Sequence, residues 1–593
     1  MLPNFRRFIT IYRGYERPFW VSQILLAIAN LFTLLIPLMT QKLVDEGLLG
    51  GDKDALQQSV LWMVLFAFLS AIFTIANAWY AVQFGEHTAH AVRMKLYRKI
   101  QEFSFGNLDQ FPTSDLMVRM TSDVNAIKAA VQQIILSLAQ APVMFVGALI
   151  LIYFNSPSLM WILLIVIPIV IVVLAFFVTK MGTFFEIQQQ KLDKLNSVLQ
   201  EDLAGVRVVK AFVQNEYENR RYDRANREFR KASLHPMQYA SFLQPTLYLI
   251  INLAIAGVLW FGGVSLTQGE VTVGEILAFT QYLATILTPL IILAVITPQI
   301  TAAEASAERM FQVMDAIPNV PNSPHPLGLD IATAKGGIVF ENVSFSYPVI
   351  TSKKAEDNHQ NHSSTLVLKN INLVIEPGQT VAFLGATGSG KSTLVNLIPR
   401  FYDVTSGRIV IDGVDVRNIP LETLHELVGI ALQESILFSG KVGENVCYGK
   451  PEATEDEMVA AATAADAHGF VSAIPEGYDA RVARRGTNFS GGQRQRLSIA
   501  RALTIKPKIL ILDDSTSALD MATEARVQEA IKNMMADTTT LFVAQRISTV
   551  ITADNIFLLD NGEIVAQGNH ETLLRSNSLY QEIYESQLGS VPA

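Results

Sequence analysis

The sequence TVAFLGATGSGKSTLVNLIPRF, residues 380–401, joins a short apolar run to a helical pattern through a glycine-rich loop. Glycines let backbone N–H groups close around phosphate oxygens, and the start of the following helix adds positive potential. The strand–loop–helix setting predicts a P-loop that holds a nucleoside triphosphate. Its expected contact residues are Gly385, Thr387, Gly388, Ser389, Gly390, Lys391, Ser392 and Thr393. Lys391 is expected to reach the β- and γ-phosphates, and Ser392 to offer its hydroxyl to Mg²⁺.

A second apolar run, residues 508–512, ends in the acidic pair Asp513 and Asp514. An acidic side chain at the end of such a strand can bind Mg²⁺ together with the serine of the P-loop. We therefore expect Asp513 and Ser392 to share a Mg²⁺ ion in an α/β P-loop ATPase domain over residues 337–593.

The first half of the chain has a different composition. The whole chain is 50% hydrophobic and only 17% charged, and the charge is missing mainly from the first half. A membrane-spanning helix needs about 20 apolar residues. The sequence therefore predicts an all-α transmembrane domain over residues 1–317, followed by a proline-rich linker at 318–336. The six expected spans are residues 18–41, 57–83, 132–154, 158–179, 242–266 and 276–297.

Lysines and arginines predict the orientation in the membrane. They are frequent in the segments 86–128 and 180–231, and few or absent in 42–54, 155–158 and 267–275. Positively charged loops stay in the cytoplasm. We therefore expect a multi-pass protein of the cell membrane with both termini and the ATPase domain in the cytoplasm. Cys447 is the single cysteine, and no basic stripe indicates a nucleic-acid partner.

Between the P-loop and Asp513 lies a short motif that resembles the signature of ATP-binding cassette (ABC) exporters: Ser490, Gly491, Gly492 and Gln493. The resemblance covers nearly the whole chain, since six spans followed by one cassette are the layout of an ABC half-transporter. It implies that Tyr347 stacks on adenine, that Gln433 senses Mg²⁺ and the transport domain, and that residues 517–520 form the D-loop. It also implies that residues 109–113 and 205–212 belong to loops whose coupling helices dock on ATPase domains.

In the family, the signature loop caps the γ-phosphate of ATP held by the P-loop of a second chain. A dimer with a second ABC half-transporter chain is therefore implied. Three positions depart from the family pattern, and one of them is Arg484, where exporters usually have a glutamate in a loop that touches the coupling helices. The other two lie in the ATP site. Asp514 stands where the family has the glutamate that acts as general base, and Gln545 stands where it has a histidine that contacts the γ-phosphate. Asp514 is one methylene shorter than glutamate, and Gln545 cannot carry positive charge.

A chain that lacks both the glutamate and the histidine resembles one subunit of heterodimeric bacterial exporters, in which one ATP site is impaired. The leading interpretation is thus ATP-driven export of amphipathic or hydrophobic small molecules, of the multidrug or lipid type, by a heterodimer. The membrane lipid itself is an expected partner. Two alternatives remain: a homodimeric exporter with Asp514 as a working base, and a nucleotide-gated regulatory subunit without useful turnover.

Overall fold

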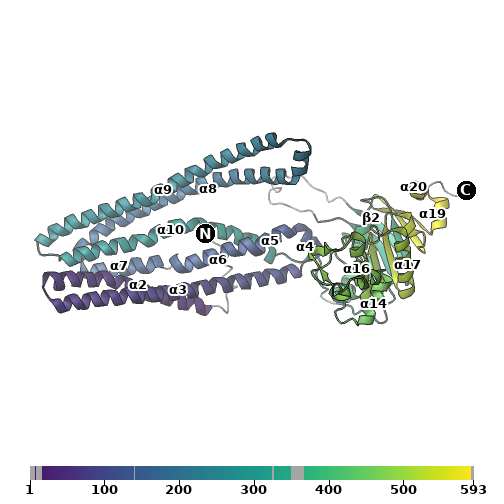
Figure 1. Ribbon diagram of the computed structural model, residues 1–593, viewed down its shortest axis with the longest axis horizontal. Coiled ribbons are helices and arrows are strands. Elements are labelled where there is room, and N and C mark those ends of the chain that lie inside the picture. Colours follow the sequence, from purple (N-terminus) through teal and green to yellow (C-terminus); the bar gives the residue numbers. More distant parts are fainter. Residues whose placement is uncertain (1–6, 8–15, 139, 324–325, 349–365, 589–593) are drawn as a thin grey trace. The chain divides into compact units, whose positions relative to one another are not determined.

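The computed structural model describes residue 7 and residues 16–138, 140–323, 326–348 and 366–588. The chain divides into two compact units, and the elements of each are labelled in Figure 1. The first unit comprises Met1–Gln101 and Ser114–Asp315, and the second comprises Glu102–Thr113 and Ala316–Ala593. The segment Glu102–Thr113, which the sequence places in the transmembrane domain, thus packs with the second unit. The expected loop at residues 350–364 lies outside the described residues.

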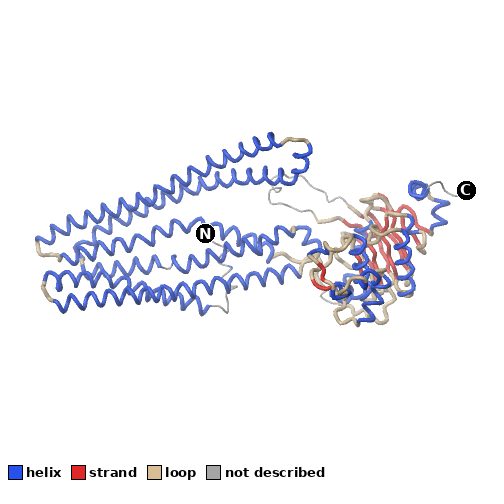
Figure 2. The backbone as a smooth tube through the Cα atoms, viewed as in Figure 1, coloured by secondary structure: helices blue, strands red, loops and turns tan. Residues whose placement is uncertain are grey.

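The described part of the first unit consists of helices joined by short loops, and no strand occurs among its described residues (Figure 2). Its elements are α2 (Glu16–Lys42), η1 (Leu43–Leu49), α3 (Lys53–Gln101), α5 (Thr113–Val118), η2 (Arg119–Asp123), α6 (Val124–Gln133), η3 (Ile134–Leu138), α7 (Gln140–Asn155), η4 (Pro157–Leu159), α8 (Met160–Ala211), α9 (Asn215–Thr267) and α10 (Val273–Met314). In Figure 1, α2 runs beside α3 and α8 runs beside α9.

Five helical stretches among the described residues are long and apolar enough to cross a membrane. They are Glu16–Leu49, Lys53–Gln101, Thr113–Asn155, Pro157–Ala211 and Asn215–Thr267, and a shorter apolar stretch, Val273–Ile286, opens α10. The side chains of Leu61, Val64 and Phe68 on α3 are more than 60% exposed. Such exposure of large apolar side chains suits lipid, whereas water would penalise it.

The helices α3, α8 and α9 are far longer than the membrane requires. They contain 49, 52 and 53 residues, and about 20 suffice for a span. Each of them is more than twice as long as a span requires, which is long enough to continue beyond the membrane as a helix. In the charged part of the α8–α9 pair, Lys191 Nζ lies 2.9 Å from Glu228 Oε2.

Cysteine labelling tests the orientation of these helices. In a Cys447→Ser background, Lys53→Cys and Gln268→Cys should react with a membrane-impermeant maleimide in intact cells, because both positions lie in segments poor in positive charge, 42–54 and 267–275. Arg224→Cys should react only after the cells are permeabilised. Labelling at position 224 in intact cells, with protection at 53 and 268, would reverse the topology.

The second unit contains β-sheets, whose strands are red in Figure 2, and helices that lie around them. A six-stranded sheet has the order β12-β11-β3-β10-β9-β6, with only β12 antiparallel to its neighbour. A four-stranded antiparallel sheet has the order β2-β1-β4-β5, and β7 pairs with β8. The strands are β1 (Ile338–Phe345), β2 (Leu368–Ile375), β3 (Thr380–Leu384), β4 (Ser406–Ile411), β5 (Val414–Asp415), β6 (Val428–Ala431), β7 (Gly440–Lys441), β8 (Arg481–Val482), β9 (Ile509–Asp513), β10 (Thr539–Ala544), β11 (Asn555–Asp560) and β12 (Glu563–Gly568).

Short helices surround these sheets. Besides α4 (Phe105–Gln110), they are α11 (Lys391–Asn396), η5 (Val416–Asn418), α12 (Leu421–Leu427), α13 (Val442–Val446), α14 (Glu455–Ala464), α15 (His468–Ser472), η6 (Gly477–Asp479), η7 (Arg484–Gly486), α16 (Gly491–Thr504), α17 (Met521–Met534), α18 (Ile547–Val550), α19 (His570–Ser576) and α20 (Ser578–Leu588). Together with the parallel sheet they give the expected α/β domain.

The parallel strands of the six-stranded sheet are buried on both faces, whereas the edge strand β12 is partly exposed. Alternate residues of β3 enter two different hydrophobic clusters, with Ala382 and Leu384 in one and Val381 and Phe383 in the other. Parallel strands covered on both faces read as continuous apolar runs. This burial explains why residues 380–384 and 508–512 stand out in the sequence as apolar runs.

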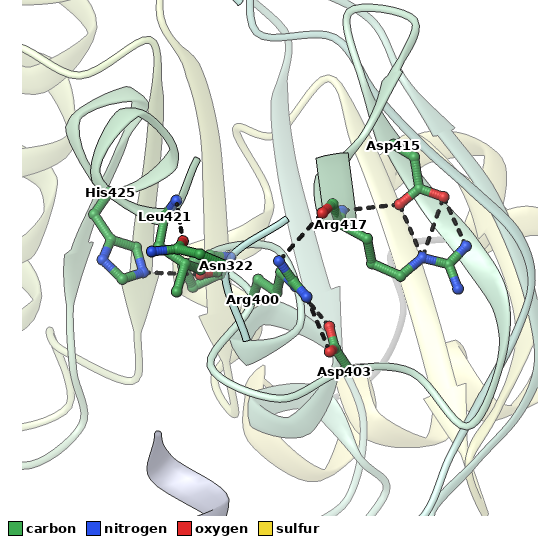
Figure 3. Close-up of polar contacts among 8 residues, drawn as sticks. Asn322, Arg400, Asp403, Asp415, Arg417, Leu421 and His425 are labelled. Atoms are coloured by element: carbon green, nitrogen blue, oxygen red, sulfur yellow. Dashed lines mark hydrogen bonds and ion pairs between the residues drawn. The ribbon is translucent and has the colours of Figure 1, made fainter. Parts of the chain in front are cut away.

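Polar contacts hold the segment after α11 in place (Figure 3). Arg400 is buried, and its guanidinium donates to Asp403 Oδ1 at 2.6 Å and to the carbonyl of Arg417 at 3.4 Å. The linker is tied nearby, because the N–H of Leu421 donates to Asn322 Oδ1 at 3.2 Å. These bonds give Phe401 and Tyr402, which follow Arg400, a defined position.

Candidate ATP site

The candidate site forms at the carboxyl ends of four adjacent parallel strands: β3, β10, β9 and β6. The P-loop follows β3, Gln545 follows β10, Asp514 follows β9, and Gln433 stands two residues after β6. In open α/β sheets, ligands bind outside the carboxyl ends of the strands. The order of the strands therefore brings together residues that lie as far apart in the sequence as Gly385 and Gln545.

The P-loop is shaped by close backbone approaches. A Cβ atom on Gly385 would lie 2.2 Å from the carbonyl oxygen of Leu559, and Gly390 has φ 101°, a conformation that favours glycine. Lys391 is 7% exposed, and its ammonium group donates to the carbonyls of Gly385 at 2.8 Å and Ala386 at 2.9 Å. Burial lowers the pKa of Lys391, while the carboxylates of Asp514 and Asp513 oppose this shift. The ammonium group of Lys391 therefore lies close enough to the carboxylates of Asp513 and Asp514 to be affected by their charge.

The residues present fit a Mg²⁺ ion. Ser392 Oγ donates to Asp513 Oδ1 at 2.8 Å, and Asp513 is 3% exposed. Burial raises the pKa of Asp513, and the hydrogen bond from Ser392 partly offsets that effect. A buried carboxylate beside a hydroxyl provides the oxygen ligands that Mg²⁺ prefers, and a cation there would stabilise the charged carboxylate.

The carboxylate of Asp514 is held by two amides. Gln433 Nε2 and Gln545 Nε2 both donate to Asp514 Oδ2, each at 3.3 Å. Burial raises the pKa of Asp514, whereas the bond from Gln433 and the charges of Lys391 and Arg546 lower it. Asp514, Gln433 and Gln545, all three singled out in the sequence, therefore meet at one oxygen atom.

Tyr347 lies at the other end of the P-loop. Its hydroxyl is 2.9 Å from Thr393 Oγ1, and the residue is 38% exposed. The ring meets that of Phe345 edge to face, with centroids 4.9 Å apart. An exposed aromatic face beside the P-loop is suited to stacking on a nucleotide base.

The signature residues make a separate local structure. Ser490 caps α16: its Oγ accepts from the N–H of Gln493 at 3.2 Å, and Gln493 Oε1 accepts from the N–H of Ser490 at 2.8 Å. In the part of the chain that the structure describes, neither side chain bonds to the P-loop. Gly491 and Gly492 open the helix, so their N–H groups are available to an anion.

Several residues that support the site carry no signal in the sequence. Gln495 ties the signature helix to the D-loop, because its Nε2 donates to Ser517 Oγ at 3.2 Å and its Oε1 accepts from the N–H of Ala518 at 2.9 Å. Gln587 of α20 makes two hydrogen bonds to the backbone of the loop that carries Gln545. It donates to the carbonyl of Gln545 at 2.9 Å and accepts from the N–H of Ile547 at 2.8 Å. Both glutamines lie far along the chain from their partners, and only the fold reveals them.

Comparison with known proteins decides the family. Residues 19–290 match the family described as "ABC transporter transmembrane region", and residues 368–517 match the family "ABC transporter". The "Uncharacterized ABC transporter ATP-binding protein YfiB" of Bacillus subtilis is 37% identical over 94% of this chain and 94% of its own length. The chain belongs to the ABC transporter family.

Two further comparisons indicate that the chain is an exporter. This ABC transporter chain is 34% identical to an "ATP-dependent lipid A-core flippase" of Syntrophus aciditrophicus, over 98% of this chain and 94% of that protein. Its fold matches a bacterial Atm1-family ABC exporter with ATP bound, at a TM-score of 0.81 and 26% identity, covering 98% and 99% of the two chains. This multi-pass ABC exporter therefore couples ATP hydrolysis to transport, with its ATPase domain in the cytoplasm.

Proposed function

We propose that this ABC exporter chain is one half of a heterodimer and that its own ATP site is hydrolytically impaired. The observation that carries the proposal is the pair of amides on Asp514 Oδ2. A general base must offer a free carboxylate oxygen to the attacking water. Here the carboxylate is one methylene shorter than glutamate, and one of its oxygens already accepts two hydrogen bonds.

The positions of the remaining residues support the following roles. Lys391 and the P-loop N–H groups bind the phosphates, and Tyr347 stacks on adenine. Ser392, Asp513 and Gln433 would hold Mg²⁺, which neutralises phosphate charge when it is bound. Gln545 can donate a hydrogen bond to the γ-phosphate but adds no positive charge.

The signature of this chain serves the other ATP site. Ser490, Gly491, Gly492 and Gln493 are intact and would cap the γ-phosphate of ATP held by the partner chain. The lipid A-core flippase among the relatives supports an amphipathic or lipid substrate. The cycle then rests on hydrolysis at the partner's P-loop, and this chain's P-loop contributes mainly ATP binding.

Lysine substitutions in the two P-loops test this asymmetry. In the co-purified complex, Lys391→Ala should leave a clear fraction of the ATPase rate, roughly a third or more, because the impaired site contributes little turnover. The corresponding substitution in the partner should lower the rate by about 10²-fold or more, the usual effect of removing a charge-stabilising donor. Phosphate release is the measurement.

Lys441→Ala is the matched control, since Lys441 is exposed and pairs with Asp479 on the surface. It should leave the rate unchanged. An equal loss from either P-loop lysine would contradict the asymmetric arrangement, as would full ATPase activity from this chain purified alone.

A further inference from the structure

The segment Glu102–Thr113 is anchored to the ATPase unit through its helix α4. The ring of Phe105 stacks on that of Phe401, with centroids 4.2 Å apart and planes at 21°. Asp109 accepts a hydrogen bond from Tyr402, whose hydroxyl lies 2.8 Å from Asp109 Oδ2. Two consecutive aromatic residues after Arg400 therefore hold the two ends of α4.

The same helix is fastened to the linker. Asn107 is 1% exposed, and its Nδ2 donates to the carbonyl of Ile317 at 3.0 Å. Its Oδ1 accepts from the N–H of Asn319 at 2.9 Å. A side chain on Gly106 would press on this contact, since its Cβ would lie 2.9 Å from Asn319 Nδ2. The linker and α4 are thus held as one piece.

Tyr402 also faces the nucleotide side of the unit. Its ring lies 5.2 Å from that of Tyr347, at 90°, and the hydroxyl of Tyr347 is 2.9 Å from Thr393 Oγ1 in the P-loop. Burial is the main cause that raises the pKa of the Tyr402 hydroxyl, so this group stays protonated and donates to Asp109. Three contacts in series therefore join Asp109 on α4 to the P-loop.

Space beside this series allows it to move. A cavity of about 320 Å³ is lined by residues of α4, the linker, β1 and the segment after α11, including Gln110, Asn319, Ser346 and Tyr402. Tightly packed side chains have one arrangement, whereas a cavity of this size leaves room for a tyrosine ring and a short helix to shift.

We propose that Tyr402 is a positioning residue that couples a nucleotide on Tyr347 to the segment Glu102–Thr113. The proposal rests on the proposed function, because it needs adenine to stack on Tyr347. A stacked base fixes the Tyr347 ring, the Tyr347 ring fixes its edge-to-face partner Tyr402, and Tyr402 fixes Asp109 through its hydroxyl. Since Thr113 begins α5, the order gained by α4 continues along the chain into the membrane unit.

Hydrogen–deuterium exchange on the assembled transporter tests this coupling without knowledge of the transported substrate. With the ATP analogue adenosine 5′-(β,γ-imido)triphosphate and Mg²⁺, amides of residues 102–113 should exchange about fivefold more slowly than without nucleotide, as one net hydrogen bond would produce. Tyr402→Phe keeps the ring and removes the hydroxyl. It should bind the analogue with wild-type affinity and lose most of this slowing.

Two variants complete the design. Tyr478→Phe removes a tyrosine hydroxyl that contacts His468 Nδ1 at 3.0 Å, and it should keep the full slowing. Asp109→Asn keeps a carbonyl oxygen that can accept a hydrogen bond from Tyr402, so this variant should keep part of the slowing. Undiminished slowing in Tyr402→Phe overturns the inference, as does nucleotide binding without any slowing in the wild type. Absence of nucleotide binding in the wild type would instead refute the ATP site on which the inference rests.

Discussion

Gly491→Asp in this chain should abolish ATP hydrolysis by the assembled transporter. Gly491 opens the signature helix, whose N–H groups are expected to meet the γ-phosphate of ATP on the partner chain. An aspartate there sets a negative charge against that phosphate in a closed interface. Such repulsion can reach several kcal/mol where the effective dielectric is low. The ATPase rate should therefore fall by about 10²-fold or more, as about 1.4 kcal/mol corresponds to a tenfold change.

The chain itself tolerates a side chain at this position. Gly491 is exposed, and a Cβ atom on it would meet only Ala518 Cβ, at 3.9 Å. At the neighbouring Gly492, by contrast, a Cβ would lie 3.1 Å from the carbonyl oxygen of Ala518. Gly491→Asn matches aspartate in size without its charge and should retain more activity. If Gly491→Asp and the wild type hydrolyse ATP at the same rate, then the signature of this chain does not belong to a working ATP site.

Restoring the family residues should revive this chain's own site. In a complex whose partner P-loop lysine is replaced, Asp514→Glu with Gln545→His should raise the remaining ATPase rate by about 10- to 100-fold. The added methylene moves the carboxylate by about 1 Å, and a misplacement of this size costs about 10²-fold. The histidine restores a group that can carry positive charge.

The single substitutions separate the two effects. Asp514→Glu alone should recover most of the gain, because Gln545 still offers a hydrogen-bond donor. Gln545→His alone should recover little, because the base is still short. If the double variant leaves the rate unchanged, then these two positions are not the cause of any impairment. The readout is steady-state phosphate release, with nucleotide affinity measured in parallel.

The core of the ATP site is predictable from sequence because each part sits on a buried strand or a glycine-rich loop. Residues 381–384 and 509–512 are apolar without interruption since both faces of their sheet are covered. The bond between Ser392 and Asp513, 121 positions apart, follows from two parallel strands that are separated by one other.

Other features of the molecule depend on tertiary packing and are not indicated by any local sequence pattern. Asp514 has φ 47°, a left-handed conformation that is uncommon outside glycine, and nothing in the sequence around it indicates this turn. The segment Glu102–Thr113 interrupts membrane helices and yet belongs to the ATPase unit, because Phe105, Asn107 and Asp109 find their partners there. Those partners lie more than 200 positions along the chain.

The central claim is that this chain's ATP site contributes little turnover while its signature is essential. The most direct test is a side-by-side ATPase assay of Asp514→Ala and Gly491→Asp in the assembled complex, with nucleotide binding and assembly measured for both. The account predicts that Asp514→Ala keeps most of the wild-type rate while Gly491→Asp loses nearly all of it. If Asp514→Ala is as inactive as Gly491→Asp, then Asp514 is a working base, and the asymmetric heterodimer is contradicted.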